Sequence, residues 1–283
     1  MRKFATTMAA CGFLLFSLAP EVESNDDTPP GFNEKTFKGL EWRGIGPALM
    51  SGRIADIAFD PTDRSTWYVA VGSGGVWKTT NQGTTWKSVF DGQGSYSIGA
   101  VTVDPNNHNT VWVGTGENVS GRHVGYGDGI YKSLDGGNTW KNMGLENSEH
   151  IGMIAIDPRD SDVVFVAAQG PLWSGGGDRG LYKTTDGGKS WDGVLWGGEF
   201  TGVSEVHMDP RNPDIMYAVK HQRIRNVAAL MNGGPESGIF KSVDGGSNWR
   251  ELTNGLPDED TGKIGLAVSP IDPDVVYATI ELG

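Results

Sequence analysis

Three carboxylates of this 283-residue sequence lie within or just after segments that otherwise read as apolar β-strands. Glu117 follows one such strand directly, and Asp56 and Glu205 occupy equivalent positions in two others. The remaining units hold small or apolar residues at that position, namely Ala100, Met153 and Gly265. Hydrolysis of a glycosidic bond requires two carboxylates, so these three are candidate catalytic residues. The alternative is a paired polar network, because His207 lies two residues beyond Glu205 on the same side of its strand.

A second group of candidates lies in glycine-rich loops, where a rigid scaffold usually carries its binding residues. These candidate ligand contacts are Glu117, Arg122, His123, Tyr126, Trp173, Asp178 and Arg179. Trp173 could stack on a sugar or a peptide side chain, or it could anchor its own loop. Solvated loop residues with no ligand remain the alternative for the whole group.

Composition excludes several other kinds of chemistry. The five histidines have no metal-ligand spacing, no phosphate-binding loop precedes a helix, and the one cysteine is Cys11. We therefore expect no metal and no cofactor. The formal net charge of −12 would repel a phosphate backbone, so we expect no nucleic-acid partner.

A repeated turn motif marks the β-strand units that position these residues. Each copy holds an Asp or Asn, then a Gly, then a Trp at fixed spacing. The copies are Asn81, Gly83 and Trp86; Asp135, Gly137 and Trp140; Asp186, Gly188 and Trp191; and Asp244, Gly246 and Trp249. The carboxylate or amide can accept hydrogen bonds from its own turn, and the tryptophan offers a large surface for packing between sheets. We interpret these residues as structural.

A strand–turn–strand element beginning with Asp-Pro or Ser-Pro recurs five times beside these turns. Together they make units of four antiparallel strands in roughly 50 residues, which is a propeller blade. Residues 39–283 are thus predicted to form an all-β, incomplete propeller of about four and a half blades. Glu41–Gly46 reads as a lone outer strand. We expect the missing C-terminal blades of a longer chain to close the ring, with closure by an oligomer as the alternative.

The N-terminus has the pattern of an export signal. Arg2 and Lys3 precede an apolar run from Ala9 to Ala19 that is too short to span a bilayer. We predict a signal peptide over residues 1–19, a flexible lead-in over 20–38, no membrane span, and a secreted or periplasmic protein. Lipidation at Cys11 is the minor alternative.

The repeated turn is the Asp-box, or bacterial neuraminidase repeat. Over residues 40–283 the chain resembles the sortilin/Vps10-type propellers and their bacterial secreted relatives, which are often labelled glycosyl hydrolases. The resemblance implies a propeller that binds a peptide, protein or glycan on its loop-rich face, with glycoside hydrolysis as the alternative.

The hydrolase alternative can be compared with the motifs of two enzyme classes that this sequence resembles. Xyloglucan-cleaving enzymes carry a catalytic Asp in a run similar to Tyr68–Gly75, where this sequence has Gly72. Glu117 lies near the same place in the next blade. Sialidases present an Arg-Ile-Pro run, which Arg53-Ile54-Ala55 resembles without the proline.

Overall fold

A computed structural model describes residue 39 and residues 52–282 of the chain. The predicted signal peptide, lead-in and outer strand Glu41–Gly46 lie outside the described residues. Residues 52–282 form antiparallel β-sheets and one short 3-10 turn, η1 (Glu146–Ser148). No helix in this part of the chain is long and apolar enough to cross a bilayer.

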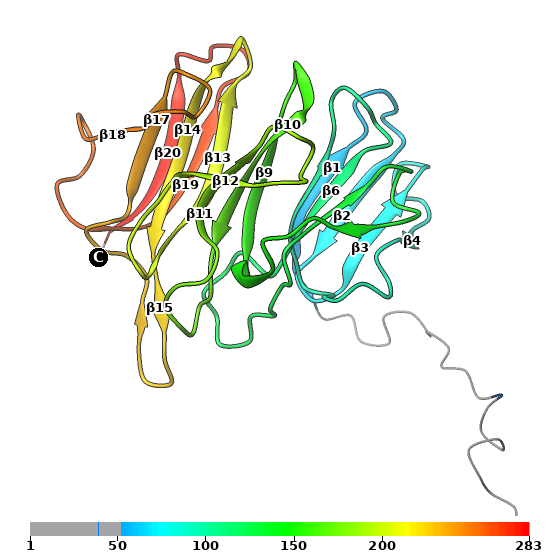
Figure 1. The fold of residues 1–283 in the computed structure, drawn as a ribbon, viewed down its shortest axis with the longest axis horizontal. Helices are drawn as coiled ribbons and strands as arrows, with labels where there is room; N and C mark the ends of the chain where they lie inside the picture. The colour runs from blue at the N-terminus through cyan, green and yellow to red at the C-terminus, as the bar shows by residue number, and fades with distance from the viewer. Residues whose placement is uncertain (1–38, 40–51, 283) are drawn as a thin grey trace, which may run out of the picture. The chain divides into compact units, whose positions relative to one another are not determined.

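Four sheets of four strands follow one another along the chain (Figure 1). The first contains β1 (Ile54–Phe59), β2 (Trp67–Val71), β3 (Gly75–Thr79) and β4 (Lys87–Ser88). The second contains β5 (Ile98–Val103), β6 (Val111–Thr115), β7 (Ile130–Ser133) and β8 (Lys141–Asn142). The third contains β9 (Ile151–Asp157), β10 (Asp160–Gln169), β11 (Arg179–Thr184) and β12 (Asp192–Leu195). The fourth contains β13 (Thr201–Asp209), β14 (Asn212–Gln222), β17 (Gly238–Ser242) and β18 (Arg250–Leu252).

Two further strands, β19 (Thr261–Val268) and β20 (Val276–Leu282), pair as the beginning of a fifth sheet. Each complete sheet runs in chain order from its first to its fourth strand, as a propeller blade does. The predicted all-β fold of Asp-box blades, four complete and one begun, is therefore confirmed.

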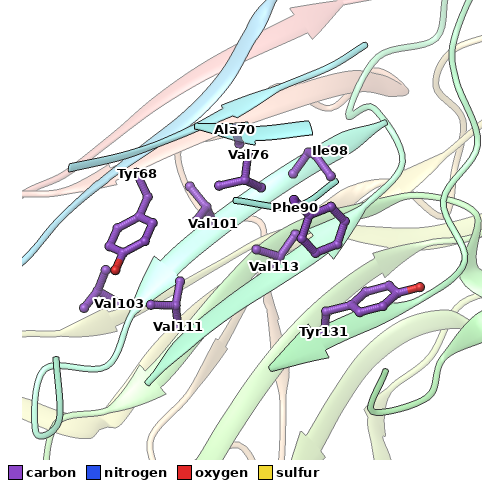
Figure 2. Packing of buried hydrophobic residues seen from close by; sticks show 10 residues of the cluster. All are labelled: Tyr68, Ala70, Val76, Phe90, Ile98, Val101, Val103, Val111, Val113 and Tyr131. Carbon is purple, nitrogen blue, oxygen red and sulfur yellow. The ribbon is translucent and has the colours of Figure 1, made fainter. Parts of the chain in front are cut away.

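The hydrophobic core lies between consecutive blades rather than within them. Figure 2 shows ten buried side chains lying between the first two blades. They are Tyr68, Ala70, Val76, Phe90, Ile98, Val101, Val103, Val111, Val113 and Tyr131. Each fully buried residue of Val, Ile or Phe size contributes about 1.5–3 kcal/mol. Cohesion between blades therefore depends on the apolar faces that strand alternation provides.

The Asp-box turns are held by hydrogen bonds of the predicted kind. Asp135 Oδ1 accepts from the backbone nitrogens of Asn138 and Thr139 at 3.0 and 2.8 Å. Ser133 Oγ accepts from the Gly137 nitrogen at 2.8 Å and donates to the same carboxylate. The Thr139 hydroxyl, which donates to Asp135 Oδ2 at 2.6 Å, lowers the pKa of Asp135 most, and together with the bonds above it brings that pKa to about 2. The network recurs at Asp186 and Asp244, and Asn81 makes a neutral version of it.

The depressed carboxyl pKa values predict a loss of stability in acid. The pKa of Asp244 is also lowered to about 2, from 3.8. Stabilisation from such a group is complete above its unfolded pKa and is lost as the pH falls from about 4 toward 2. The triple variant D135N/D186N/D244N should lose less stability over this interval, because Asn81 already holds the same turn without a charge. Urea unfolding at pH 5 and pH 2.5 checks this, and equal acid sensitivity of both proteins would contradict it.

In the first three blades, a lysine near the end of the third strand links its blade to the Asp-box of the next blade. Its ammonium donates to a backbone oxygen of that box while lying over an aromatic ring of its own blade. The contacts run from Lys78 to Gly136, Lys132 to Gly187 and Lys183 to Gly245, at 2.8, 3.1 and 2.9 Å. The rings are those of Tyr68, Trp112 and Phe165. The sequence signal for these contacts is a lysine three residues after a glycine, in Gly75–Lys78, Gly129–Lys132 and Gly180–Lys183.

Candidate functional site

The loops between second and third strands lie together at one end of the blades. In the fourth blade this loop begins after Gln222, because β14 continues to Gln222 through its pairing with β13. It also contains a hairpin of β15 (Ile224–Arg225) and β16 (Leu230–Met231). This hairpin extends beyond the sheets (Figure 1). It therefore adds a projecting surface beside the other loops.

The loop of the second blade, residues 116–128, reaches across to the fourth and fifth blades. Arg122 Nη2 donates to the Val227 oxygen of the hairpin at 3.0 Å. Arg225 Nε donates back to the Ser120 oxygen at 2.8 Å. Lys263 Nζ, on β19, donates to the Asn118 oxygen at 2.9 Å. The chain thus fixes this loop at several points, and the candidate residues within it are held by a scaffold.

Glu117 is buried, and its carboxylate is held on several sides. It forms an ion pair with Arg53, which is 46% exposed. Glu117 Oε1 also accepts from Ser73 Oγ at 3.0 Å, and Oε2 accepts from the Gly125 nitrogen at 3.4 Å. A β-carbon built on Gly72 would lie 2.5 Å from Glu117 Oε1. The carboxylate of the second blade therefore occupies the space beside Gly72 that a side chain of the first blade would need.

Asp56 and Glu205 both connect one blade to the next. Asp56 Oδ2 accepts from the Val101 nitrogen at 3.0 Å, and Glu205 Oε2 accepts from the Leu266 nitrogen at 2.7 Å. Burial raises the pKa of Asp56, although the hydrogen bond from the Val101 nitrogen lowers it. His207 Nε2 lies 3.1 Å from Glu205 Oε2, as its position on the strand predicted. The two acids occupy equivalent bridging positions and are not brought together.

The third-blade loop contains one buried and two half-buried candidates. Arg179 is buried, and its guanidinium donates to the backbone oxygen of Gln169 at the end of β10 and to those of Pro171, Ser174 and Gly176 in the loop. Burial lowers its pKa to about 10, so it remains a cation at neutral pH. Asp178 accepts from the Asn147 nitrogen at 3.0 Å. Trp173 is half-buried in the same loop. We assign Arg179 to positioning the loop.

The accessible candidates are in the second-blade loop. Arg122 and His123 are exposed, and Tyr126 is 55% exposed with its ring 6.1 Å from that of His150. Tyr96 is a further exposed aromatic that the sequence reasoning missed. Its neighbour Ser95 donates through Oγ to the Tyr126 oxygen at 2.7 Å, which places the two segments side by side. The signal for Tyr96 was an aromatic in an otherwise polar, glycine-rich connection.

The described residues contain no cluster of side chains that could hold a metal ion. Within residues 52–282 no three side chains of His, Cys, Asp or Glu converge as they would around an ion. The loop end instead combines exposed aromatic rings, arginine and histidine beside a buried carboxylate. Such a surface can stack on flat faces of a ligand and donate hydrogen bonds to its oxygens.

Comparison with known proteins gives one family match. The family model described as Sortilin-Vps10 (sortilin, neurotensin receptor 3) matches residues 128–275. Among curated proteins, the xyloglucanase Xgh74A of Acetivibrio thermocellus is 27% identical over 256 residues, covering 77% of this chain and 27% of that protein. A xyloglucanase of Hypocrea jecorina is 26% identical and covers 60% of this chain and 21% of its own length. The chain thus spans about a quarter of the length of these relatives.

Solved structures of GH74 enzymes share the fold. The GH74 enzyme of Niastella koreensis is 25% identical, with a TM-score of 0.55, and the match covers 80% of this chain and 34% of that one. An ancestral GH74 enzyme is 17% identical with a TM-score of 0.57, covering 78% and 28% of the two chains.

Proposed function

Because the chain belongs to the Sortilin-Vps10 family, we propose that it is part of an extracellular propeller that binds a carbohydrate on its loop face. The observation that carries the proposal is the exposed group of Arg122, His123 and Tyr126. Their loop is held in place by the β15–β16 hairpin, by β19 and by Ser95. The xyloglucanase relatives favour a glucan-type ligand over a peptide. The predicted signal peptide supports a location outside the cytoplasm.

Binding without cleavage fits the state of the three candidate carboxylates. Glu117 is paired with Arg53, and Asp56 and Glu205 accept backbone N–H groups of the neighbouring blades. A catalytic pair would need to flank one scissile bond. The three acids contribute instead to contacts between blades.

Binding to xyloglucan oligosaccharides, measured by isothermal titration calorimetry, tests this proposal. Loss of an aromatic stacking contact is worth about 0.5–1.5 kcal/mol, so Tyr126→Ala should weaken binding by up to about tenfold. Tyr277→Ala is the matched control, because Tyr277 is an exposed tyrosine of β20. Absence of binding by the wild-type protein, or equal weakening by both variants, would overturn the proposal.

Hydrolysis is the second candidate function, and the position of Glu117 favours it. In the enzymes that the sequence resembles, the position of Gly72 carries the catalytic Asp, and here the Glu117 carboxylate fills the space beside Gly72. Release of reducing ends from xyloglucan that Glu117→Gln abolishes would support hydrolysis. Binding that persists in Glu117→Gln, with no turnover by either protein, would leave the first proposal standing alone.

We also propose that further blades complete the ring. The face of the first blade that points away from the second blade has an apolar surface. It is lined by Ile54, Ile57, Trp67, Val69, Val71, Trp77 and Trp86. Exposed apolar sheet faces of this kind are normally covered in a native propeller.

A further inference from the structure

The connection between β18 and β19 contains an exposed Asn-Gly pair, Asn254-Gly255. The Leu256 nitrogen donates to the Thr253 oxygen at 3.3 Å, and Gly255 has a φ of +77°, so the pair lies at the centre of a tight turn. Among residues 52–282, neither the side-chain amide of Asn254 nor the backbone nitrogen of Gly255 has a hydrogen-bond partner. A β-carbon on Gly255 would meet nothing within 4 Å. No contact therefore keeps the two groups apart.

These two groups can react with each other without an enzyme. The Gly255 nitrogen attacks Cγ of Asn254 and gives up its proton, the bond from Cγ to the amide nitrogen breaks, and ammonia leaves. The product is a succinimide ring. Water then opens the ring at one of its two carbonyls, which gives aspartate or isoaspartate. Glycine in the second position favours ring closure, because it has no β-carbon to obstruct the approach.

A second Asn-Gly pair, Asn232-Gly233, follows the β15–β16 hairpin and is held in place. Asn232 Nδ2 donates to Glu281 Oε2 at 2.8 Å. A β-carbon on Gly233 would lie 2.7 Å from the Thr261 oxygen, so the backbone at the start of β19 packs directly against this pair. The hydrogen bond from the amide to the carboxylate must break before the ring can close, which slows the reaction by about tenfold.

The first blade has the same turn with an aspartate in place of Asn254. Asp91 precedes Gly92, which has a φ of +81°, and the Gln93 nitrogen donates to the Phe90 oxygen at 3.4 Å. The turn therefore accommodates an aspartate at this position. Isoaspartate differs, because its side-chain carbon becomes part of the main chain and lengthens the turn.

We propose that Asn254 is a site of spontaneous deamidation and isomerisation, and that its isoaspartate product loosens the contact between the fourth blade and β19. Leu256, two residues after Asn254, packs against the buried cluster that joins these elements. The buried members of this cluster are Tyr217, Val219, Ile239, Ile264 and Leu266. A longer main chain between Thr253 and Leu256 would displace the leucine from the cluster. This inference is independent of any carbohydrate ligand.

Incubation of the whole chain at mildly alkaline pH in water labelled with oxygen-18 tests the site. Ring opening by this water leaves one heavy oxygen in the product, which peptide mass spectrometry locates. Label should accumulate at Asn254 about tenfold faster than at Asn232. In urea the hydrogen bond of Asn232 is lost, so the two sites should be labelled at similar rates. Equal labelling in the folded chain, or the same difference in urea, would overturn the assignment.

The effect on the blade contact is measured by thermal unfolding of fresh and aged protein. Partial loss of the leucine contact should lower the Tm of the aged wild type by about 2–4 °C. Fresh Asn254→Asp should keep the wild-type Tm, because it has the new charge on a main chain of normal length. Aged Asn254→Gln should also keep it, because glutamine would have to close a larger ring. An equal fall in aged Asn254→Gln, or label at Asn254 without a fall in Tm, would contradict the proposed loosening.

Discussion

Replacing Gly188 with alanine is expected to lower the free energy of unfolding by about 2–5 kcal/mol. Gly188 has a φ of +92°, and a β-carbon there would lie 2.6 Å from Trp112 of the preceding blade. The left-handed conformation costs a residue with a β-carbon about 1–2 kcal/mol. Forcing an extra carbon against a packed ring costs about 1–3 kcal/mol more. Urea unfolding, followed by tryptophan fluorescence, measures the change.

Gly92 provides the control for this substitution. It has a φ of +81°, is exposed, and has nothing within 4 Å of an added β-carbon. Gly92→Ala should therefore show the conformational cost alone, about 1–2 kcal/mol. If the two variants are equally destabilised, the contact between the Asp-box glycine and the preceding blade does not limit packing, and the interpretation of Gly188 is wrong.

Truncating Trp191 is expected to cost about 3 kcal/mol, the lower end of the range for removing a large aromatic from a packed site. Its ring packs edge-on against Trp112 with centroids 6.1 Å apart. Its Nε1 also donates to the Met143 oxygen of the preceding blade at 2.8 Å. Trp191→Ala would remove both contacts between the second and third blades. Equilibrium unfolding of the variant checks the value.

Trp86 occupies the same position of the first Asp-box and serves as the control. It is 40% exposed and packs against Trp67 of its own blade, with ring centroids 6.4 Å apart. Trp86→Ala should cost about 1 kcal/mol, close to the value of one aromatic pair. An equal loss in both variants would mean that the tryptophans act within their blades rather than between them.

The sequence alone determined the blade architecture, because each blade is specified by turn motifs and strand patterns that involve only residues close together in the chain. An Asp135-type turn needs only its own backbone and a glycine that accepts positive φ, so each Asp-box can be recognised without knowing its neighbours. Alternation along a strand likewise predicts two distinct faces, as in β6, where Val111 and Val113 pack against the first blade and Trp112 against the third. The same reasoning placed His207 beside Glu205, since residues two apart on a strand share a face.

Tertiary structure alone decided what the candidate site residues contact. Glu117 meets Arg53, Asp56 meets the Val101 nitrogen, and Arg223 meets Val119, and each contact joins segments of different blades. No periodicity encodes which loop crosses to which blade, because that depends on loop length and the angle between sheets. Arg223 is buried through contacts with the second-blade loop, to whose Val119 oxygen its Nη1 donates. The propeller can therefore be predicted from local sequence patterns. The contacts of its buried charged side chains form only when segments far apart in the sequence pack together.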